Sequence, residues 1–199
     1  MFVTFEGIDG SGKSTQAELL AEALRADGRA VVATREPGGT ELGERVRDLL
    51  LGQSAGITPW AETALFAAAR AQLVEEVIQP ALSDGAVVVC DRYLDSSLAY
   101  QGLARGLGVE RVLELNLHVT RGLLPDRTFL LVLGAEEAAR RAPDAPDRIE
   151  QEGVELQAAV ERAYEELATM FPNRIKKLDA TRPAAELARI VRDELRELS

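Results

Sequence analysis

A glycine-rich segment near the N-terminus constrains this chain more than any other part of the sequence. Residues 7–14 read Gly-Ile-Asp-Gly-Ser-Gly-Lys-Ser, which matches the phosphate-binding pattern GxxxxGK[ST]. The apolar run Phe2–Glu6 predicts a strand before it, and apolar periodicity predicts a helix at about Ser14–Ala26 after it. Glycines let backbone N–H groups turn toward one anion, and the helix N-terminus adds a favourable dipole. The segment therefore predicts a nucleoside triphosphate site at a strand-to-helix turn.

The residues of this loop have distinct expected roles. Lys13 supplies a point charge to the outer phosphates, and the Ser14 hydroxyl is a candidate Mg²⁺ ligand. A glycine-rich turn with a chance lysine is disfavoured, because the pattern and its strand-to-helix context agree. The loop residues expected to bind the nucleotide are Gly7, Ile8, Asp9, Gly10, Ser11, Gly12, Lys13, Ser14 and Thr15.

Strands and helices are expected to alternate along the rest of the chain. Further strands are predicted at about Ala30–Thr34, Ala86–Cys90, Thr128–Leu133 and Arg174–Leu178. Further helices are predicted at about Glu41–Leu51, Pro59–Leu82, Ser96–Ala104, Val109–Thr120, Ala135–Arg141, Glu150–Met170 and Pro183–Leu198. This alternation predicts a parallel sheet with helices on both faces. We expect one α/β domain over residues 1–199, with a Pro-interrupted mobile segment near 140–148.

Composition excludes several classes of protein. The chain of 199 residues has a formal net charge of −10, which disfavours binding to nucleic acids or anionic membranes. It has no apolar run long enough for a membrane helix, and its first residues lack the pattern of a signal peptide. A single cysteine and a single histidine exclude internal disulfides and multi-histidine or cysteine-based zinc sites. We expect a cytoplasmic protein that uses a hard cation bound by oxygen.

Polar residues follow two of the predicted strands. Asp91 and Arg92 come directly after the run Ala86–Cys90, and a loop at residues 34–40 follows the second strand. Ligands of parallel sheets sit at the carboxyl ends of the strands, so Asp91 could hold Mg²⁺ and Arg92 a phosphate. Two alternatives stay open. Asp91 could simply cap the next turn, and Gly38-Gly39 could form a plain turn.

One helix pairs an aromatic ring with a guanidinium. Phe66 and Arg70 are four residues apart, which places both on one helical face. Such a pair could stack on a base and hold its phosphate. The residues alone favour the alternative, an amphipathic helix with Phe66 in the core and Arg70 in water.

Several segments together resemble the thymidylate kinase family. They are Arg35-Glu36-Pro37-Gly38-Gly39-Thr40, Leu65–Arg70, Asp91-Arg92-Tyr93, Asp95–Gly102 and Asp147–Glu152, in addition to the glycine loop. The resemblance implies a nucleoside monophosphate kinase fold of the P-loop class with five parallel strands. It also implies ATP and dTMP as substrates, Mg²⁺ as the metal, and a homodimer.

The resemblance assigns an acceptor site. Phe66 would stack on thymine, Tyr100 would crowd the sugar 2′ position, and Asp9 would contact the 3′-hydroxyl. The dTMP-binding residues implied are Asp9, Arg35, Glu36, Arg47, Phe66, Arg70, Arg92, Ser97, Tyr100 and Gln101.

A lid at about residues 140–150 is implied in the same way. Some members carry an arginine in the glycine loop where this chain has Gly10, and here the lid can supply that charge through Arg140, Arg141 or Arg148. Arg148 is the first candidate and Arg141 the second, while Arg182 would lie near the adenine. The implied catalytic residues are Lys13, Asp91, Arg92 and Arg148, and the implied metal ligands are Ser14 and Asp91.

The expected enzyme transfers the γ-phosphoryl group of ATP to dTMP without a general base, because the acceptor oxygen is already anionic. A regulatory GTPase would need an Asn-Lys-x-Asp element, and neither Asn116 nor Asn173 is followed by lysine. An ATPase that positions a partner would not need the acceptor-site pairs. A kinase for another nucleoside monophosphate or for a deoxynucleoside remains a further alternative.

Overall fold

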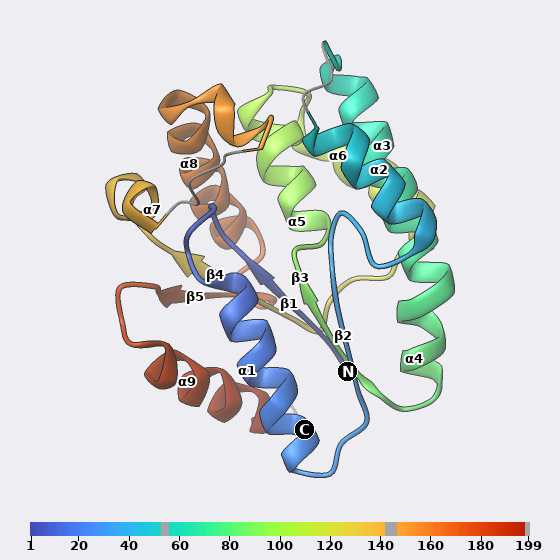
Figure 1. The fold of residues 1–199 in the computed structure, drawn as a ribbon, viewed down its shortest axis with the longest axis vertical. Helices are drawn as coiled ribbons and strands as arrows, with labels where there is room; N and C mark the ends of the chain where they lie inside the picture. The colour runs from blue at the N-terminus through green and yellow to red at the C-terminus, as the bar shows by residue number, and fades with distance from the viewer. Residues whose placement is uncertain (53–55, 142–146, 198–199) are drawn as a thin grey trace.

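The computed structural model describes residues 1–52, 56–141 and 147–197, and these form a five-stranded parallel sheet (Figure 1). The strands are β1 (Phe2–Glu6), β2 (Val31–Arg35), β3 (Val87–Asp91), β4 (Arg127–Val132) and β5 (Ile175–Asp179). Their order in the sheet is β2-β3-β1-β4-β5, and all four pairings are parallel. The parallel sheet predicted from the alternation of elements is confirmed.

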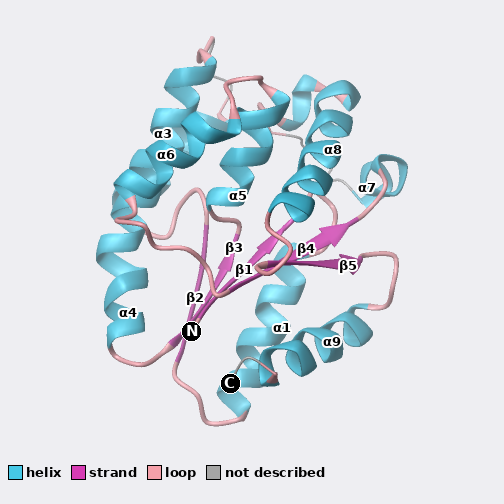
Figure 2. Ribbon diagram, turned by 180° about the vertical axis from the view of Figure 1, so that it is seen from behind, coloured by secondary structure: helices cyan, strands magenta, loops and turns pink. Residues whose placement is uncertain are grey.

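Helices cover both faces of the sheet. The helical segments are α1 (Lys13–Ala26), α2 (Glu41–Leu51), α3 (Pro59–Leu73), a π-helical turn (Val74–Ile78), α4 (Gln79–Ser83), α5 (Leu94–Ser97), a π-helical segment (Leu98–Ala104), α6 (Val109–Val119), α7 (Ala135–Arg141), a 3₁₀ turn (Glu150–Glu152), α8 (Val154–Met170) and α9 (Ala184–Arg196). Helices α1 and α9 pack together on one face, and α8 packs with the segment at 98–104 on the other (Figure 2). Within the described ranges, no helix has the length and apolar character to cross a membrane.

Two predicted helices differ from those observed. The helix expected to reach Leu82 contains the π-helical turn Val74–Ile78, beyond which it continues as α4. The helix expected to begin at Glu150 begins at Val154, because Gly153 has a positive φ of 92° that no α-helix contains. The expected break at residues 142–146 lies outside the described residues.

Strands β2, β3 and β5 run one residue beyond their predicted ends. The register pairs Arg35 of β2 with Asp91 of β3, and Phe5 of β1 with the same Asp91. Polar residues thus continue the ladder, since main-chain pairing does not depend on an apolar side chain. This register brings the ends of three strands together with the glycine loop that follows β1.

Strand β1 presents two different faces to the core. Phe5 stacks on Phe129 with 5.5 Å between ring centroids. On the opposite face, Thr4 bonds to Thr128 across 2.8 Å, and Glu6 accepts hydrogen bonds from α8 and from the start of α5. Both polar side chains are completely buried. The core below the site is therefore polar on one side of the sheet, although the strand reads as apolar.

Candidate active site

The glycine loop has a backbone that only glycine adopts freely. Gly10 has a φ of 79°, and a Cβ built there would lie 2.8 Å from the Ala138 carbonyl oxygen of α7. Gly12, with a φ of 92°, precedes α1 and offers no side-chain cap. The first N–H groups of α1 therefore face the loop with the dipole of a 14-residue helix behind them. This arrangement suits an anion.

Lys13 is the buried cation of the loop. Its side chain is 7 % exposed, its Nζ donates to the Ile8 carbonyl at 2.9 Å, and Nζ lies 3.6 Å from Asp9 Oδ1. Burial, reinforced by the charge of Arg92, lowers the pKa of Lys13 to about 8 despite the opposing charge of Asp9. A bound phosphate would favour the charged form of Lys13 and so oppose the effect of burial on its pKa.

Ser14 and Asp91 fit a magnesium ion. The Ser14 hydroxyl donates to Asp91 Oδ2 at 2.5 Å. The other carboxylate oxygen, Asp91 Oδ1, is buried with no hydrogen-bond partner among the described residues. A hydroxyl and a carboxylate are hard oxygen ligands, so this orphaned oxygen at the end of β3 provides the chemistry that Mg²⁺ requires.

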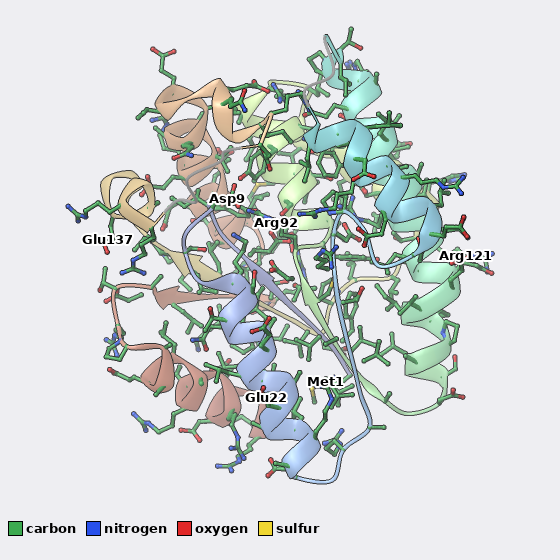
Figure 3. The ribbon with its side chains drawn as sticks, in the orientation of Figure 1. Met1, Asp9, Glu22, Arg92, Arg121 and Glu137 are labelled. Atoms are coloured by element: carbon green, nitrogen blue, oxygen red, sulfur yellow. The ribbon has the colours of Figure 1, made fainter. Side chains whose placement is uncertain are left out.

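Arg92 stands over the loop from the opposite side. Its φ is 68°, a left-handed conformation that is rare outside glycine, and its guanidinium forms an ion pair with Asp9. Figure 3 shows the two side chains pointing toward one another at the end of the sheet. Burial opposes ionisation of Asp9, but the charges of Arg92 and Lys13 prevail and lower its pKa to about 2.

A cavity of about 420 Å³ joins this loop to the expected acceptor site. Its lining includes loop and strand-end residues together with helical ones from α2, α3 and the segment 96–101. The predicted site residues in its wall are Asp9, Gly10, Gly12, Lys13, Ser14, Thr15, Arg35, Glu36, Arg47, Phe66, Asp91, Arg92, Ser97, Tyr100 and Gln101. Gly7, Ile8 and Ser11 lie in the loop but not in this wall.

Arg35 and Arg47 enter the cavity differently. Arg35 Nη2 donates to both oxygens of Glu44, at 3.1 and 3.0 Å, and its side chain is half-exposed. Arg47 Nη1 donates to the Pro37 carbonyl at 2.9 Å, and no carboxylate is among the described contacts of this guanidinium. The charge of Arg47 is thus the less compensated of the two.

Arg70 is buried and does not reach into water. Its side chain is 1 % exposed and its Nη2 lies 2.5 Å from Glu36 Oε2. It also donates to Ser97 Oγ at 3.0 Å, to the Tyr93 carbonyl at 3.1 Å and to Asn116 Oδ1. Of the two readings left open by the sequence, a solvated Arg70 is wrong. The guanidinium supports the cavity wall from behind Ser97 and Glu36.

The two lid arginines Arg141 and Arg148, and Arg182 after β5, lie in different places. Arg141 has its Cβ 3.3 Å from the position a Gly10 Cβ would take, and its Nη1 donates to the Ala180 carbonyl at 3.2 Å. Arg148 is turned to α2 and α3, where its Nε donates to the Leu50 carbonyl at 2.7 Å. Arg182 pairs with Asp179 and Glu186. Of these three, Arg141 is the one beside the glycine loop.

Four supporting residues were not singled out by sequence reasoning. Glu6 is a fully buried carboxylate whose pKa is raised to about 7, first by burial and then by the charge of Asp95. Glu62, 1 % exposed, accepts from Gln101, Arg105 and Arg148. The other two are Tyr164, whose hydroxyl accepts from Arg92, and Asn116, whose Oδ1 accepts from Arg70. Only Glu6 had a signal, an acidic residue ending an apolar strand, whereas the others read as ordinary helical positions.

The geometry of this site defines the class of protein to which the chain belongs. A phosphate loop and a strand-end carboxylate share one cavity with an aromatic and polar pocket, at the carboxyl edge of a five-stranded parallel sheet. Such a fold and site are those of a P-loop kinase of the nucleoside monophosphate kinase type.

Comparisons with known proteins narrow the class to one family. Residues 5–191 match the family model described as Thymidylate kinase. The thymidylate kinase of Bifidobacterium longum is 46 % identical over 203 residues, covering 100 % of this chain and 98 % of the relative. That of Deinococcus radiodurans is 49 % identical over 191 residues, covering 94 % of this chain and 92 % of the relative.

A solved structure agrees. The crystal structure of thymidylate kinase from Ehrlichia chaffeensis superposes with a TM-score of 0.77 at 34 % identity, covering 96 % of this chain and 98 % of that one. The chain belongs to the thymidylate kinase family. Its activity is the ATP-dependent phosphorylation of dTMP to dTDP.

Proposed function

We propose that this enzyme transfers the γ-phosphoryl group by neutralising charge and positioning both substrates, without a general base. The main support is that one cavity has both Lys13 of the phosphate loop and Phe66 of the expected acceptor site in its wall. Both substrates can therefore be held next to each other in that cavity. The acceptor oxygen of dTMP is already anionic at neutral pH, so no proton has to be removed. The reaction instead requires two polyanions to meet, which needs preorganised positive charge.

In this proposal the phosphate loop holds ATP. The loop N–H groups and Lys13 bind its phosphates, and Thr15 lines the same wall. Ser14 and Asp91 would hold Mg²⁺, which when bound would supply positive charge to the phosphates. Arg182 lies on the loop after β5 expected near the adenine.

Arg92 is proposed to bind the acceptor phosphate and to stabilise charge during transfer. Asp9 and the glycine loop fix its guanidinium, which donates to the Gly7 carbonyl at 3.0 Å. Arg35, Glu36 and Arg47 complete the phosphate end of the acceptor site.

The nucleoside end of the acceptor site lies in the same wall. Phe66 stacks on thymine, and Gln101 contacts its edge with Ser97 close by. The resemblance implied that Arg70 also bonds to this edge, but Arg70 is not in the cavity wall and donates to Ser97 Oγ, so we assign it to holding Ser97 in place. The Tyr100 hydroxyl lies 3.5 Å from Asp9 Oδ2, so the two side chains can share the sugar. Thymine and uracil differ by one methyl, worth about 1–3 kcal/mol, so weak activity on dUMP is expected.

The lid contributes two arginines with separate roles in this proposal. Arg141 replaces the arginine that the loop lacks at Gly10, because it lies against that glycine. Arg148 was the first catalytic candidate from the sequence, but in this proposal it serves the acceptor side instead. Glu62, which also accepts from Gln101, holds Arg148 there at 2.5 Å. The whole chain then works as one kinase domain with a lid at about 140–150, of which residues 142–146 lie outside the described part.

A homodimer is proposed from the exposed apolar side chains on neighbouring helices. Leu42 and Leu49 of α2 and Trp60 of α3 are 44 %, 52 % and 44 % exposed. Helices α2 and α3 pack against each other, so a pair of neighbouring helices carries these residues (Figure 1). A second copy would cover them, and replacing Leu49 by glutamate should yield a monomer in light scattering.

The single buried Cys90 and the substrates ATP and dTMP suit a cytoplasmic enzyme.

The decisive experiment is a coupled ADP-release assay with MgATP and a panel of acceptors. The panel is dTMP, dUMP, dCMP, dGMP, AMP, GMP, UMP, thymidine and water. The proposal requires dTMP to lead by a wide margin, followed weakly by dUMP. Another leading monophosphate would overturn the assignments of Phe66, Tyr100 and Gln101, and release with water alone would overturn the acceptor site.

A further inference from the structure

Glu6 is a buried carboxylate directly beneath the active site that the mechanism above does not use. It does not line the cavity and is completely buried. Its Oε1 accepts hydrogen bonds from the backbone N–H of Tyr93 at 2.8 Å and of Ser96 at 3.3 Å. Its Oε2 accepts from Ser96 Oγ at 2.6 Å and from the Tyr164 hydroxyl at 2.8 Å. Four donors converge on one carboxylate from α5, its preceding turn and α8.

The same two hydroxyls lie between Glu6 and Arg92. Arg92 Nη1 donates to Ser96 Oγ and to the Tyr164 hydroxyl, each at 3.3 Å. The two hydroxyl oxygens are 3.0 Å apart. A guanidinium can only donate, so each hydroxyl must accept from Arg92 and direct its own proton elsewhere. Glu6 Oε2 is the acceptor placed to receive both protons.

We propose that Glu6 is a positioning residue for phosphoryl transfer, which orients Arg92 through the hydroxyls of Ser96 and Tyr164. The inference rests on the proposed function, in which Arg92 binds the acceptor phosphate. When Glu6 is ionised, which with its pKa of about 7 is complete only at a pH above 7, both hydroxyls turn their lone pairs toward the guanidinium. A neutral group at position 6 that donates a proton would reverse at least one hydroxyl and point its hydrogen at Arg92.

Arg92 needs such support because its backbone is strained. A φ of 68° is unfavourable for a residue with a Cβ. The Tyr100 ring lies on another side of the guanidinium, with 5.7 Å from the ring centroid to Cζ, and Asp9 pairs with Nη2. The two hydroxyls and the Gly7 carbonyl hold Nη1. Arg92, held in this way, lines the cavity.

The test is a double-mutant cycle between Glu6→Gln and Arg92→Ala, measured in the full-length enzyme with MgATP and dTMP. If Glu6 acts through Arg92, Glu6→Gln lowers kcat/KM for dTMP roughly tenfold or more in the wild-type background, as contacting side chains typically couple. KM for ATP changes by less than about twofold. In the Arg92→Ala background the same substitution changes kcat/KM for dTMP by less than about twofold. An equal loss in both backgrounds, or no loss in either, overturns the inference.

Asp95→Asn is the matched control. Asp95 is an equally buried carboxylate two residues from Tyr93, and it pairs with Arg174 and Thr128 rather than with Arg92. Because the charge of Asp95 raises the pKa of Glu6, Asp95→Asn favours the Glu6 carboxylate, so any loss of kcat/KM should come from stability and be the same with and without Arg92. A coupling to Arg92 as large as that of Glu6 would show that any buried charge here suffices, and would overturn a specific role for Glu6.

Tyr164→Phe decides the matter if Glu6→Gln does not fold. This variant removes one hydroxyl and leaves Glu6 with three donors, so the thermal midpoint should change little. A lowered kcat/KM for dTMP, with KM for ATP unchanged, supports the inference, and unaltered dTMP kinetics overturn it. Failure of the wild-type enzyme to phosphorylate dTMP would instead overturn the proposed function, so the two failures are distinguishable.

Discussion

Replacing Arg70 by methionine should destabilise the enzyme severely and in a pH-dependent manner. The substitution keeps most of the side-chain volume but leaves the Glu36 carboxylate, 3 % exposed, without its partner. Breaking a buried ion pair from one side costs about 3–5 kcal/mol. Asn116 Oδ1, buried in α6, also loses its arginine donor, at a cost of about 1–3 kcal/mol. Because these terms share one network, we expect a combined loss of roughly 4 kcal/mol.

The sign of the pH dependence follows from Glu36. Burial already raises the pKa of Glu36 in the folded enzyme, and Arg70 opposes that rise. Without Arg70 the folded-state pKa rises further above its ordinary value of 4.5, so the folded state binds more protons than the unfolded state at higher pH. The penalty of Arg70→Met should therefore be smallest near pH 5 and should grow as the pH rises.

Urea unfolding of four proteins at several pH values between 5 and 8 provides the assay. The proteins are the wild type, Arg70→Met, Glu36→Gln and the double variant. In a chain of this size, 4 kcal/mol corresponds to a fall in Tm of about 8–16 °C. The double variant should recover at least half of the loss, since no unpaired charge remains. A loss below about 1 kcal/mol, or a double variant no more stable than Arg70→Met, would refute the buried-charge reasoning.

Three further predictions concern activity. Lys13 has a pKa of about 8, so kcat/KM for ATP should fall as the pH rises above 8, and Lys13→Arg should remove that fall; a profile flat to pH 10 in the wild type would contradict it. Asp91→Asn should raise the Mg²⁺ concentration for half-maximal rate roughly 10–100-fold, and an unchanged Mg²⁺ titration would exclude Asp91 from the metal site. Arg141→Ala should lower kcat by about 10³, whereas Arg148→Ala should chiefly raise KM for dTMP; steady-state kinetics showing the reverse would exchange the two roles.

The backbone plan was predictable because it depends on local patterns. Strand β1 and helix α2 have the bounds that the sequence predicted, and Gly28, with a φ of 79°, ends the turn after α1. The glycine loop was equally predictable, since its backbone conformation arises within eight consecutive residues and the helix that supplies the dipole follows directly in the chain. The strand-end position of Asp91 followed from the same logic, because parallel strands end together.

The side-chain networks were decided by tertiary structure. Glu6 and Tyr164 are 158 positions apart in the chain, and Arg70 and Asn116 are 46 apart, so no local spacing relates them. Whether Arg70 faces water or Glu36 depends on how α3 packs against the sheet and α6, which helical periodicity does not specify. Sequence reasoning thus left Arg70 open and ranked Arg148 above Arg141 in the lid.

What the sequence by itself determined is the class of chemistry: a loop that binds phosphates, a strand-end carboxylate and the order of the elements around them. What only the tertiary structure decided is which charges face each other. Arg92 lies over Asp9, Arg141 lies against Gly10, and Arg148 is held by Glu62. The physical reason is that local backbone propensity acts over a few residues, whereas burial pairs each charge with whichever partner the packed elements bring within reach.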